Sequence, residues 1–160
     1  MGAGVLPIAI HNKQVYLLLG KEAGSGGWSD FGGGREKNES HLETAIREGV
    51  EELNGFFGTE SDMRNRIKEN GVGVITTENP IYKSFIIEVD YDPLLPKYFN
   101  SNFKLMNRKL KYEVIKHNGL FEKSEIQWFR LEELKKLRFR RYFYYSVYPS
   151  IVNFFSNYKV

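Results

Sequence analysis

The chain has 160 residues, which suits one domain with a hydrophobic core of its own. It contains no cysteine, which excludes disulfide bonds, thiolate metal sites and a cysteine nucleophile. The formal net charge of +3 weakly favours anionic partners such as phosphates or nucleic acid. No apolar run reaches the roughly 18 residues of a membrane span, and residues 1–10 do not resemble a signal peptide. We therefore expect no membrane partner and a cytoplasmic location.

Two apolar runs near the N-terminus predict a β-hairpin. Residues 5–10 and 15–19 suit strands, and residues 11–13 between them suit a tight turn. Residues 24–34 then hold six glycines, which predicts loop geometry in that segment.

The clearest helix signal covers residues 40–53. Ser40 and Glu43 have the spacing of a capping box, in which each side chain bonds the backbone of the other residue. Apolar residues recur every three or four positions and give the helix one apolar stripe. Asn54 and Gly55 follow, and both residue types accept the left-handed conformation that ends helices.

The rest of the chain mixes strands with helices, which predicts a single α/β domain over residues 1–160. A basic amphipathic helix is predicted as an insertion near 97–117, and an aromatic segment covers 138–160, where Pro149 is expected to interrupt the chain before a last helix. The other predicted strands cover 73–76, 82–89 and 126–129, and the other helices lie at 61–70 and from 131 to 137.

Three acidic residues of the predicted helix share one side. Glu48, Glu51 and Glu52 stand three and four positions apart, so they converge opposite the apolar stripe and form an acidic face. Like charges at this spacing destabilise a helix by roughly a few tenths of a kcal/mol, and a divalent cation would turn their repulsion into ligation. The alternative is an ordinary solvated face, because acids cluster on many helices.

Glycines and acids together resemble a known signature. Residues 33–55 read GGREKNESHLETAIREGVEELNG, which is similar to the box of the Nudix hydrolases. The flanks, with Trp28 before Phe31 and the segment 125–134, also look like those of this family. Gly49 and Asn54 depart from the box, but no carboxylate is missing. The positions that match the box are Gly33, Glu39, Arg47, Glu48, Glu51 and Glu52.

The resemblance implies both a fold and a reaction. The fold would be a mixed β-sheet sandwiched between helices (α/β/α). The reaction would be Mg²⁺- or Mn²⁺-dependent hydrolysis of a diphosphate linkage in a phosphorylated, nucleotide-like substrate. Glu48, Glu51 and Glu52 would hold roughly one to three ions, and Glu48 and Glu52 would be the principal ligands because they are one turn apart. A backbone carbonyl of Gly32 would be a further ligand, and the metal would lower the pKa of the attacking water.

Further catalytic roles follow from the same resemblance. Arg47 is expected to brace Glu39, with an exposed pair to a neighbouring glutamate as the alternative. The general base of this family often lies in the loop before the last strand. Counting back from Trp128 makes Glu122 the first choice and Glu125 the second, with a glutamate of the box as the third.

Substrate contacts are assigned from residue chemistry. Lys21 and Arg35 would bond phosphate, and Gly33 and Gly34 would present backbone groups to metal or phosphate. Trp28 would stack on a base, as Tyr82 or Phe85 also would. Each has an ordinary alternative, namely a solvated charge, turn geometry or core packing.

Two basic segments, 104–116 and 135–145, interleave cations with aromatic residues, a pattern that suits RNA as well as a solvated helix face. Among the substrates that the resemblance implies, a small nucleotide, a 5′-capped RNA and a diphosphoinositol phosphate stay open. The alternative function is a non-catalytic nucleotide- or RNA-binding module on the same fold, although such modules usually lose carboxylates of the box. The sequence is compatible with a monomer and with a homodimer.

Overall fold

The computed structural model describes residues 1–117 and 119–158. Its strands are β1 (Gly2–His11), β2 (Gln14–Glu22), β3 (Trp28–Ser29), β4 (Phe31–Gly34), β5 (Gly71–Glu78), β6 (Ile81–Glu88) and β7 (Lys123–Arg130). Its α-helices are α1 (His41–Glu52), α2 (Glu60–Asn70), α3 (Leu95–Lys109), α4 (Tyr112–His117) and α5 (Tyr148–Ser156). A 3₁₀-helix η1 (Leu131–Lys136) and a π-helical turn η2 (Phe143–Val147) lie between β7 and α5.

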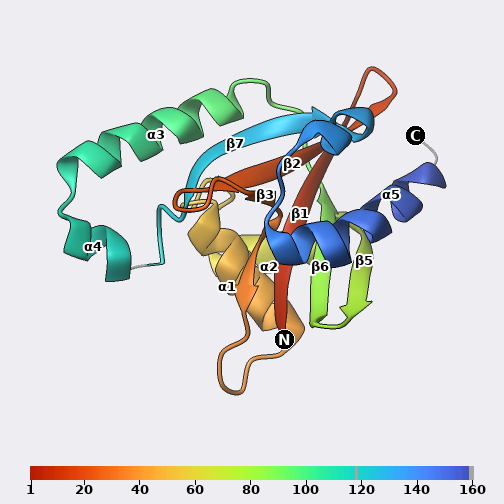
Figure 1. Ribbon diagram of the computed structural model, residues 1–160, viewed down its shortest axis with the longest axis horizontal. Helices are drawn as coiled ribbons and strands as arrows, with labels where there is room; N and C mark the ends of the chain where they lie inside the picture. Colours follow the sequence, from red (N-terminus) through yellow and green to blue (C-terminus); the bar gives the residue numbers. More distant parts are fainter. Residues whose placement is uncertain (118, 159–160) are drawn as a thin grey trace.

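All the strands of the described chain belong to one mixed sheet (Figure 1). Its main path runs β3-β2-β1-β6-β5, while β4 pairs with β1 and β7 pairs with β2. On one edge of β1, residues 2–5 pair with β4 and residues 8–11 pair with β2. β6 runs parallel along the other edge. The sheet therefore branches at β1, and β4 separates there from the β2–β7 pair.

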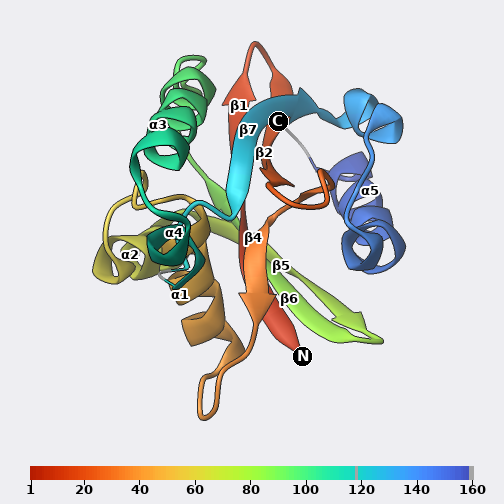
Figure 2. The same ribbon diagram turned by 60° about the vertical axis from the view of Figure 1, so that its left-hand side comes forward.

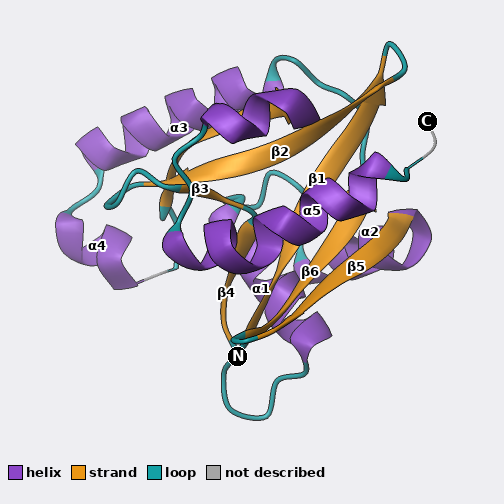
Figure 3. Ribbon diagram, turned by 45° about the vertical axis from the view of Figure 1, so that its right-hand side comes forward, coloured by secondary structure: helices purple, strands orange, loops and turns teal. Residues whose placement is uncertain are grey.

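Helices cover both faces of this sheet (Figures 2 and 3). Side chains alternate along β1, so Val5 and Ala9 point to the face under α1, α2 and α3, and Leu6 and Ile8 point to the face under η2 and α5. Each face has its own hydrophobic cluster. The predicted α/β/α arrangement is confirmed.

Helix α1 begins and packs as its sequence predicts. Ser40 Oγ accepts a 3.2 Å hydrogen bond from the Glu43 amide, and the Glu43 carboxylate accepts a 2.7 Å bond from the Ser40 amide, which confirms the capping box. Gly49 lies against β1, where an added Cβ would be 2.7 Å from Cγ2 of Val5. A glycine in a helix costs roughly 1 kcal/mol relative to alanine. Here it lets α1 approach the sheet closely.

Two local predictions were wrong. Residues 31–34, expected in a loop, form β4, because glycine lets this strand lie close to β1: a Cβ on Gly32 would be 2.5 Å from the Cα of its partner Gly4. Pro149, expected to interrupt the chain, lies in the first turn of α5, directly after η2. Proline has no amide hydrogen to donate, and the first turn of an α-helix is where that loss is tolerated.

The basic insertion consists of two helices instead of one, because Leu110 has extended backbone angles and ends α3. Phe99 is the buried anchor of α3. Asn100 bonds both backbone groups of Ile126, which satisfies the outer edge of β7. No helix in the described ranges is long and apolar enough to cross a membrane. Of the aromatic segment 138–160, the last two residues lie outside the described part.

Candidate active site

The acids of α1 face the glycines of β4, and Glu52 lies at the inner end of this contact. Its Oε2 accepts a 2.7 Å hydrogen bond from the Gly32 amide, and only 2% of the residue is exposed. The prediction of an exposed acidic face was wrong for this residue. Glu52 follows Ala45 and Gly49 at helical spacing, so it belongs to the stripe that α1 buries against the sheet.

The pKa values of these acids reflect their burial. Burial raises the pKa of the Glu52 carboxyl to about 8, and the Lys123 ammonium opposes the shift. Burial also raises the pKa of Glu48 and of Glu51, and Arg47 opposes both shifts. The site therefore holds acids whose negative charge is incompletely compensated by the protein.

Arg47 joins the loop before α1 to the acids on the helix. Its Nε and Nη2 donate to the Glu39 carboxylate at 2.7 and 3.1 Å, which confirms the predicted brace. Nη1 donates to Glu48 at 2.8 Å and to Glu51 at 3.2 Å, and Nη2 also reaches the carbonyl of Gly34. One guanidinium thus positions two of the predicted metal ligands relative to β4.

The brace predicts a pH dependence of stability. Hydrogen bonds from Arg47 lower the pKa of Glu39 from 4.5 to about 2. Because the pKa is lower in the folded state, this stabilisation is fully present above about pH 4.5 and is lost as the pH falls towards about 2. Urea unfolding should show a steeper loss of stability between about pH 5 and 2 in the wild type than in Glu39→Gln. Equal slopes would contradict a stabilising role for this ion pair.

Gly33 leaves the space that the Glu48 carboxylate fills. A Cβ at this position would lie 2.5 Å from Oε1 and 2.6 Å from Oε2 of Glu48. Gly34 has no atom within 4 Å of its Cβ position, so it is a matched neighbour without this constraint.

Gly33→Ala is expected to displace the Glu48 carboxylate and to lower kcat by about 10²-fold, since a shift of about 1 Å in a catalytic group has effects of that size. The free energy of unfolding should change by less than about 1 kcal/mol, because the displaced atoms are the flexible end of a side chain. Gly34→Ala should behave as the wild type. Steady-state kinetics and urea unfolding of both variants check the prediction, and equal kcat values would refute it.

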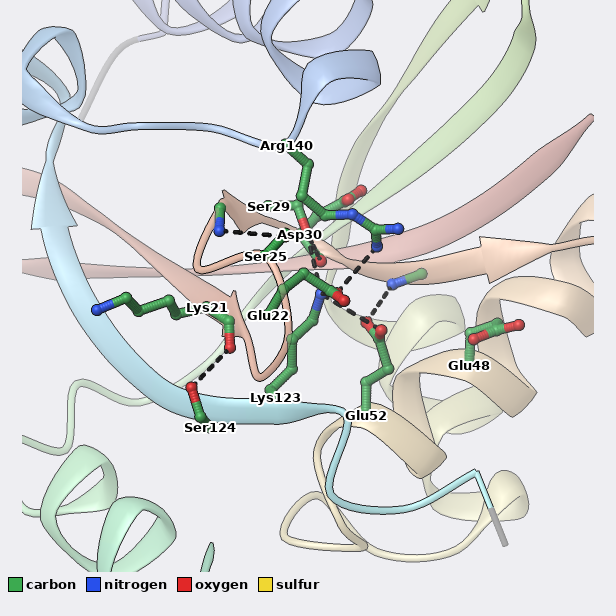
Figure 4. A network of polar contacts seen from close by, with 12 residues as sticks. Lys21, Glu22, Ser25, Ser29, Asp30, Glu48, Glu52, Lys123, Ser124 and Arg140 are labelled. Atoms are coloured by element: carbon green, nitrogen blue, oxygen red, sulfur yellow. Dashed lines mark hydrogen bonds and ion pairs between the residues drawn. The ribbon is translucent and has the colours of Figure 1, made fainter. Parts of the chain in front are cut away.

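A buried polar network continues inwards from Glu52, and Figure 4 shows its members converging from separate parts of the chain. Lys123 Nζ lies 2.6 Å from Glu22 Oε1, 3.0 Å from Ser29 Oγ and 3.3 Å from Glu52 Oε1. Arg140 donates to the same Glu22 oxygen at 2.9 Å. Sequence reasoning missed this network, because its members lie far apart in the sequence.

Asp30 forms a second buried cluster beside this network. Its carboxyl is fully buried and accepts hydrogen bonds from the hydroxyls of Tyr82, Ser84 and Tyr142 at 2.7 to 3.2 Å. Burial raises the pKa of Asp30, and the bond from Ser84 opposes the shift. The cluster fixes the two tyrosine rings with respect to β4.

The two candidates for the general base lie in different surroundings. Glu122 is exposed. Its negative charge raises the pKa of Glu48 and of Glu51, although the burial of those two carboxyls has the larger effect. Its loop is tied to the end of α1, because the Phe121 amide donates to Asn54 Oδ1 at 2.9 Å. Glu125 instead pairs with Lys21 at 3.4 Å.

A cavity of about 220 Å³ adjoins Gly32, Gly33 and Gly34 of β4, which form the glycine edge of the site. Its walls include the rings of Tyr82 and Tyr142, the apolar residues Pro80 and Ile81, and the guanidinium of Arg140. Gly33 and Gly34 line it, together with Met1, Gly2 and Gly32.

Two of the other predicted substrate contacts lie away from the acids. Trp28 is buried in the core, where it meets the ring of Phe129 edge-on at 4.9 Å. The side chain of Lys21 points away from Glu52 (Figure 4). Arg35 is exposed just beyond β4, and its amide donates to the carbonyl of the cavity residue Met1 at 3.2 Å. The structure therefore brings together Gly32, Gly33, Gly34, Arg47, Glu48, Glu51, Glu52 and Glu122, with Arg35 beside the cavity, but not Trp28 or Lys21.

The donor set at the α1–β4 edge suits a hard divalent cation. Carboxylate and carbonyl oxygens are the ligands that Mg²⁺ prefers, and Gly33 provides a cradle that any side chain would fill. Within 1–117 and 119–158, no three His, Cys, Asp or Glu side chains are gathered closely enough to hold an ion as they stand. Arg47 holds Glu48 and Glu51 in this arrangement. The residues fit a metal that competes with Arg47 for their oxygens.

Two solved structures share the fold of this chain. A Nudix hydrolase from M. smegmatis, RenU, aligns with a TM-score of 0.62 and 14% identity over 99% of this chain and 88% of its own. A C. elegans Ap4A hydrolase, in a binary complex, aligns with a TM-score of 0.58 and 15% identity over 99% of this chain and 100% of its own. No family model matches the sequence, and no curated protein matches it. The chain has the Nudix fold.

Proposed function

We propose that this protein is a Mg²⁺- or Mn²⁺-dependent Nudix pyrophosphohydrolase that cleaves a diphosphate linkage in a nucleotide-like substrate. The observation that carries the proposal is the contact between Glu48 and Gly33, at the edge where α1 meets β4. It is supported by the Nudix fold and by the complete set of box carboxylates. Binding modules on this fold usually lose such carboxylates, so the hydrolase is favoured over a non-catalytic module.

Each part of the site has a role in this reaction. When bound, the divalent cation supplies charge neutralisation at the diphosphate and lowers the pKa of the attacking water. Glu48 and Glu51 would hold the cation, and Arg47 orients both carboxylates. Glu122 accepts a proton from the water as its oxygen attacks phosphorus, and the anhydride P–O bond breaks with its electron pair going to the leaving phosphate.

The cavity beside the glycines favours a nucleotide among the substrates left open by the sequence. Its walls are mainly apolar and aromatic, and Arg140 is the cation among its lining residues. A planar base would fit between such walls, while its phosphate would lie at Arg140 and the glycine edge. A diphosphoinositol phosphate carries several phosphates and would require a denser group of cations.

Capped RNA is the second substrate candidate, because α3 presents Lys104, Arg108 and Lys109 to solvent. If RNA phosphates bind these residues, affinity should fall steeply with salt, and a variant with all three replaced by glutamine should lose that dependence. If affinity for capped RNA barely changes between about 50 and 200 mM salt, this candidate is refuted.

Product analysis with a panel of substrates tests the proposal. The panel holds nucleoside triphosphates, a dinucleoside polyphosphate, ADP-ribose, capped RNA and a diphosphoinositol phosphate, each with and without Mg²⁺ or Mn²⁺. We expect metal-dependent cleavage of a small nucleotide at the diphosphate. Folded protein that binds a nucleotide but cleaves no member of the panel would favour the non-catalytic module instead.

A further inference from the structure

The ammonium of Lys123 is buried against the acids of the site. The residue is 0% exposed, although lysine is almost never fully buried unless it is paired. An ammonium has three N–H donors, and three acceptors surround this one: Glu22 Oε1 at 2.6 Å, Ser29 Oγ at 3.0 Å and Glu52 Oε1 at 3.3 Å. Its hydrogen-bonding capacity is therefore satisfied by the protein alone.

The surrounding strands are built around this lysine. Gly20 on β2 leaves room for its stem, since a Cβ there would lie 2.9 Å from Cδ of Lys123. Glu22 is its cross-strand partner and is also fixed by Arg140. Ser29 comes from β3. Three contacts from separate elements thus keep the ammonium in place (Figure 4). Because the ammonium is part of the chain, it cannot exchange with solvent as a metal ion does.

The charges divide into an inner and an outer group. In the inner group, the carboxyls of Glu22 and Glu52 both contact the ammonium of Lys123, and Glu22 also contacts the guanidinium of Arg140. The outer group is not balanced, because a single guanidinium serves three carboxylates. A divalent cation would neutralise the two negative charges left over among these residues, which are Glu39, Arg47, Glu48 and Glu51.

The oxygens of Glu52 are both engaged in the inner group. Oε1 faces Lys123, and Oε2 accepts from the Gly32 amide at 2.7 Å. The side chain of Glu51, by contrast, is 33% exposed, and that of Glu48 is 13% exposed and fills the cradle at Gly33. Open ligand positions therefore lie on the outer side.

We propose that Lys123 is a built-in cation that takes the place of a metal ion on the inner side of Glu52. Exchangeable divalent ions then bind only on the outer side, at Glu48 and Glu51, and Glu52 acts as a positioning residue that holds β4 through Gly32. The inference rests on the proposed function in taking the acids of α1 as the metal-binding edge.

Counting bound Mn²⁺ by electron paramagnetic resonance, in the full-length protein without substrate, tests the inference. Lys123→Met keeps an unbranched side chain but removes the charge, so Glu22 and Glu52 should bind one additional Mn²⁺. Lys21→Met, on the neighbouring strand and paired with Glu125, is the control and should bind as many ions as the wild type. The same count in Lys123→Met as in the wild type would overturn the inference.

Thermal unfolding gives a second measurement in case Lys123→Met is unstable. Two buried carboxylates without their cation destabilise the metal-free variant, and Mn²⁺ should restore it, so saturating Mn²⁺ should raise its Tm by several degrees more than that of the wild type. An equal rise in both proteins would contradict the inference.

Glu52→Gln separates this inference from the proposed function. If Glu52 is a positioning residue, this variant should keep the wild-type number of Mn²⁺ ions, whereas Glu48→Gln should lose one. Loss of an ion in Glu52→Gln would overturn the role of Lys123 but leave the hydrolase intact. If Glu48→Gln instead retains every ion, the acids of α1 are not the metal-binding site, and both this inference and the proposed function are refuted.

Discussion

Replacing Glu122 by glutamine is expected to lower kcat by about 10²- to 10⁴-fold and to change KM little, which is the usual range for the loss of a general base. The loop of Glu122 touches the acids, since an added Cβ on Gly119 would lie 3.2 Å from Cδ of Glu51. Glutamine keeps the size of the side chain but cannot accept the proton of the attacking water. Because Glu122 is exposed, the free energy of unfolding should stay close to that of the wild type.

Glu125→Gln is the matched control, only three residues further along the chain. Its carboxylate pairs with Lys21, and the side chain of Lys21 points away from Glu48 and Glu52 (Figure 4). We expect kcat and KM of this variant to match the wild type. Steady-state kinetics at saturating Mg²⁺ compares the two variants. A large loss in Glu125→Gln with full activity in Glu122→Gln would reverse the assignment of the base.

Replacing Glu48 by glutamine is expected to lower kcat by about 10³-fold, which corresponds to about 4 kcal/mol of transition-state stabilisation. The variant loses an anionic ligand at the glycine edge but keeps a side chain that still fits beside Gly33. The Mg²⁺ concentration for half-maximal activity should also rise. Both quantities come from a titration of activity with Mg²⁺ at saturating substrate.

Glu69→Gln is the control for a lost surface charge, because Glu69 is an exposed residue of α2 and does not contact the site. Its kcat and its Mg²⁺ requirement should be unchanged. Thermal unfolding without metal distinguishes lost ligation from lost folding in Glu48→Gln. Wild-type activity in a folded Glu48→Gln would remove this residue from the metal site.

Local features of the fold were predictable from the sequence. The hairpin of β1 and β2, the capping box at Ser40 and the left-handed Asn54 depend on residues within a few positions of one another. These three patterns are dictated by helix and turn geometry, so periodicity and spacing are sufficient to find them. The bond from Arg47 to Glu39 was expected instead from the resemblance to the Nudix box.

The inner half of the site depends instead on tertiary structure. Lys123 meets Glu22 across 101 positions, and Tyr82 meets Asp30 across 52. No spacing rule connects residues so far apart. Helical periodicity also failed to predict that Glu52 is buried. Glu52 lies on the buried face of α1 with Ala45 and Gly49, but neither a glycine nor a carboxylate marks a position as buried in the sequence.

The C-terminal segment illustrates the same limit. Its cations and aromatic rings suggested either RNA binding or core packing. The structure links Phe139 to Trp28 by a β-bridge, and the Arg140 amide donates to the Trp28 carbonyl at 2.9 Å. This pairing brings Arg140 and Tyr142 to the cavity. Arg140 therefore lies near the glycines because of a pairing between residues far apart in the sequence, which local sequence patterns do not predict.

Anomalous diffraction at the manganese edge, from crystals grown with Mn²⁺ and a non-hydrolysable dinucleoside polyphosphate, tests the central claim most directly. We predict a manganese peak between Glu48, Glu51 and the glycines of β4, with a base of the analogue against the apolar and aromatic walls of the cavity and a phosphate at Arg140. A bound analogue with no manganese on these carboxylates would contradict the assignment of this edge as the catalytic site.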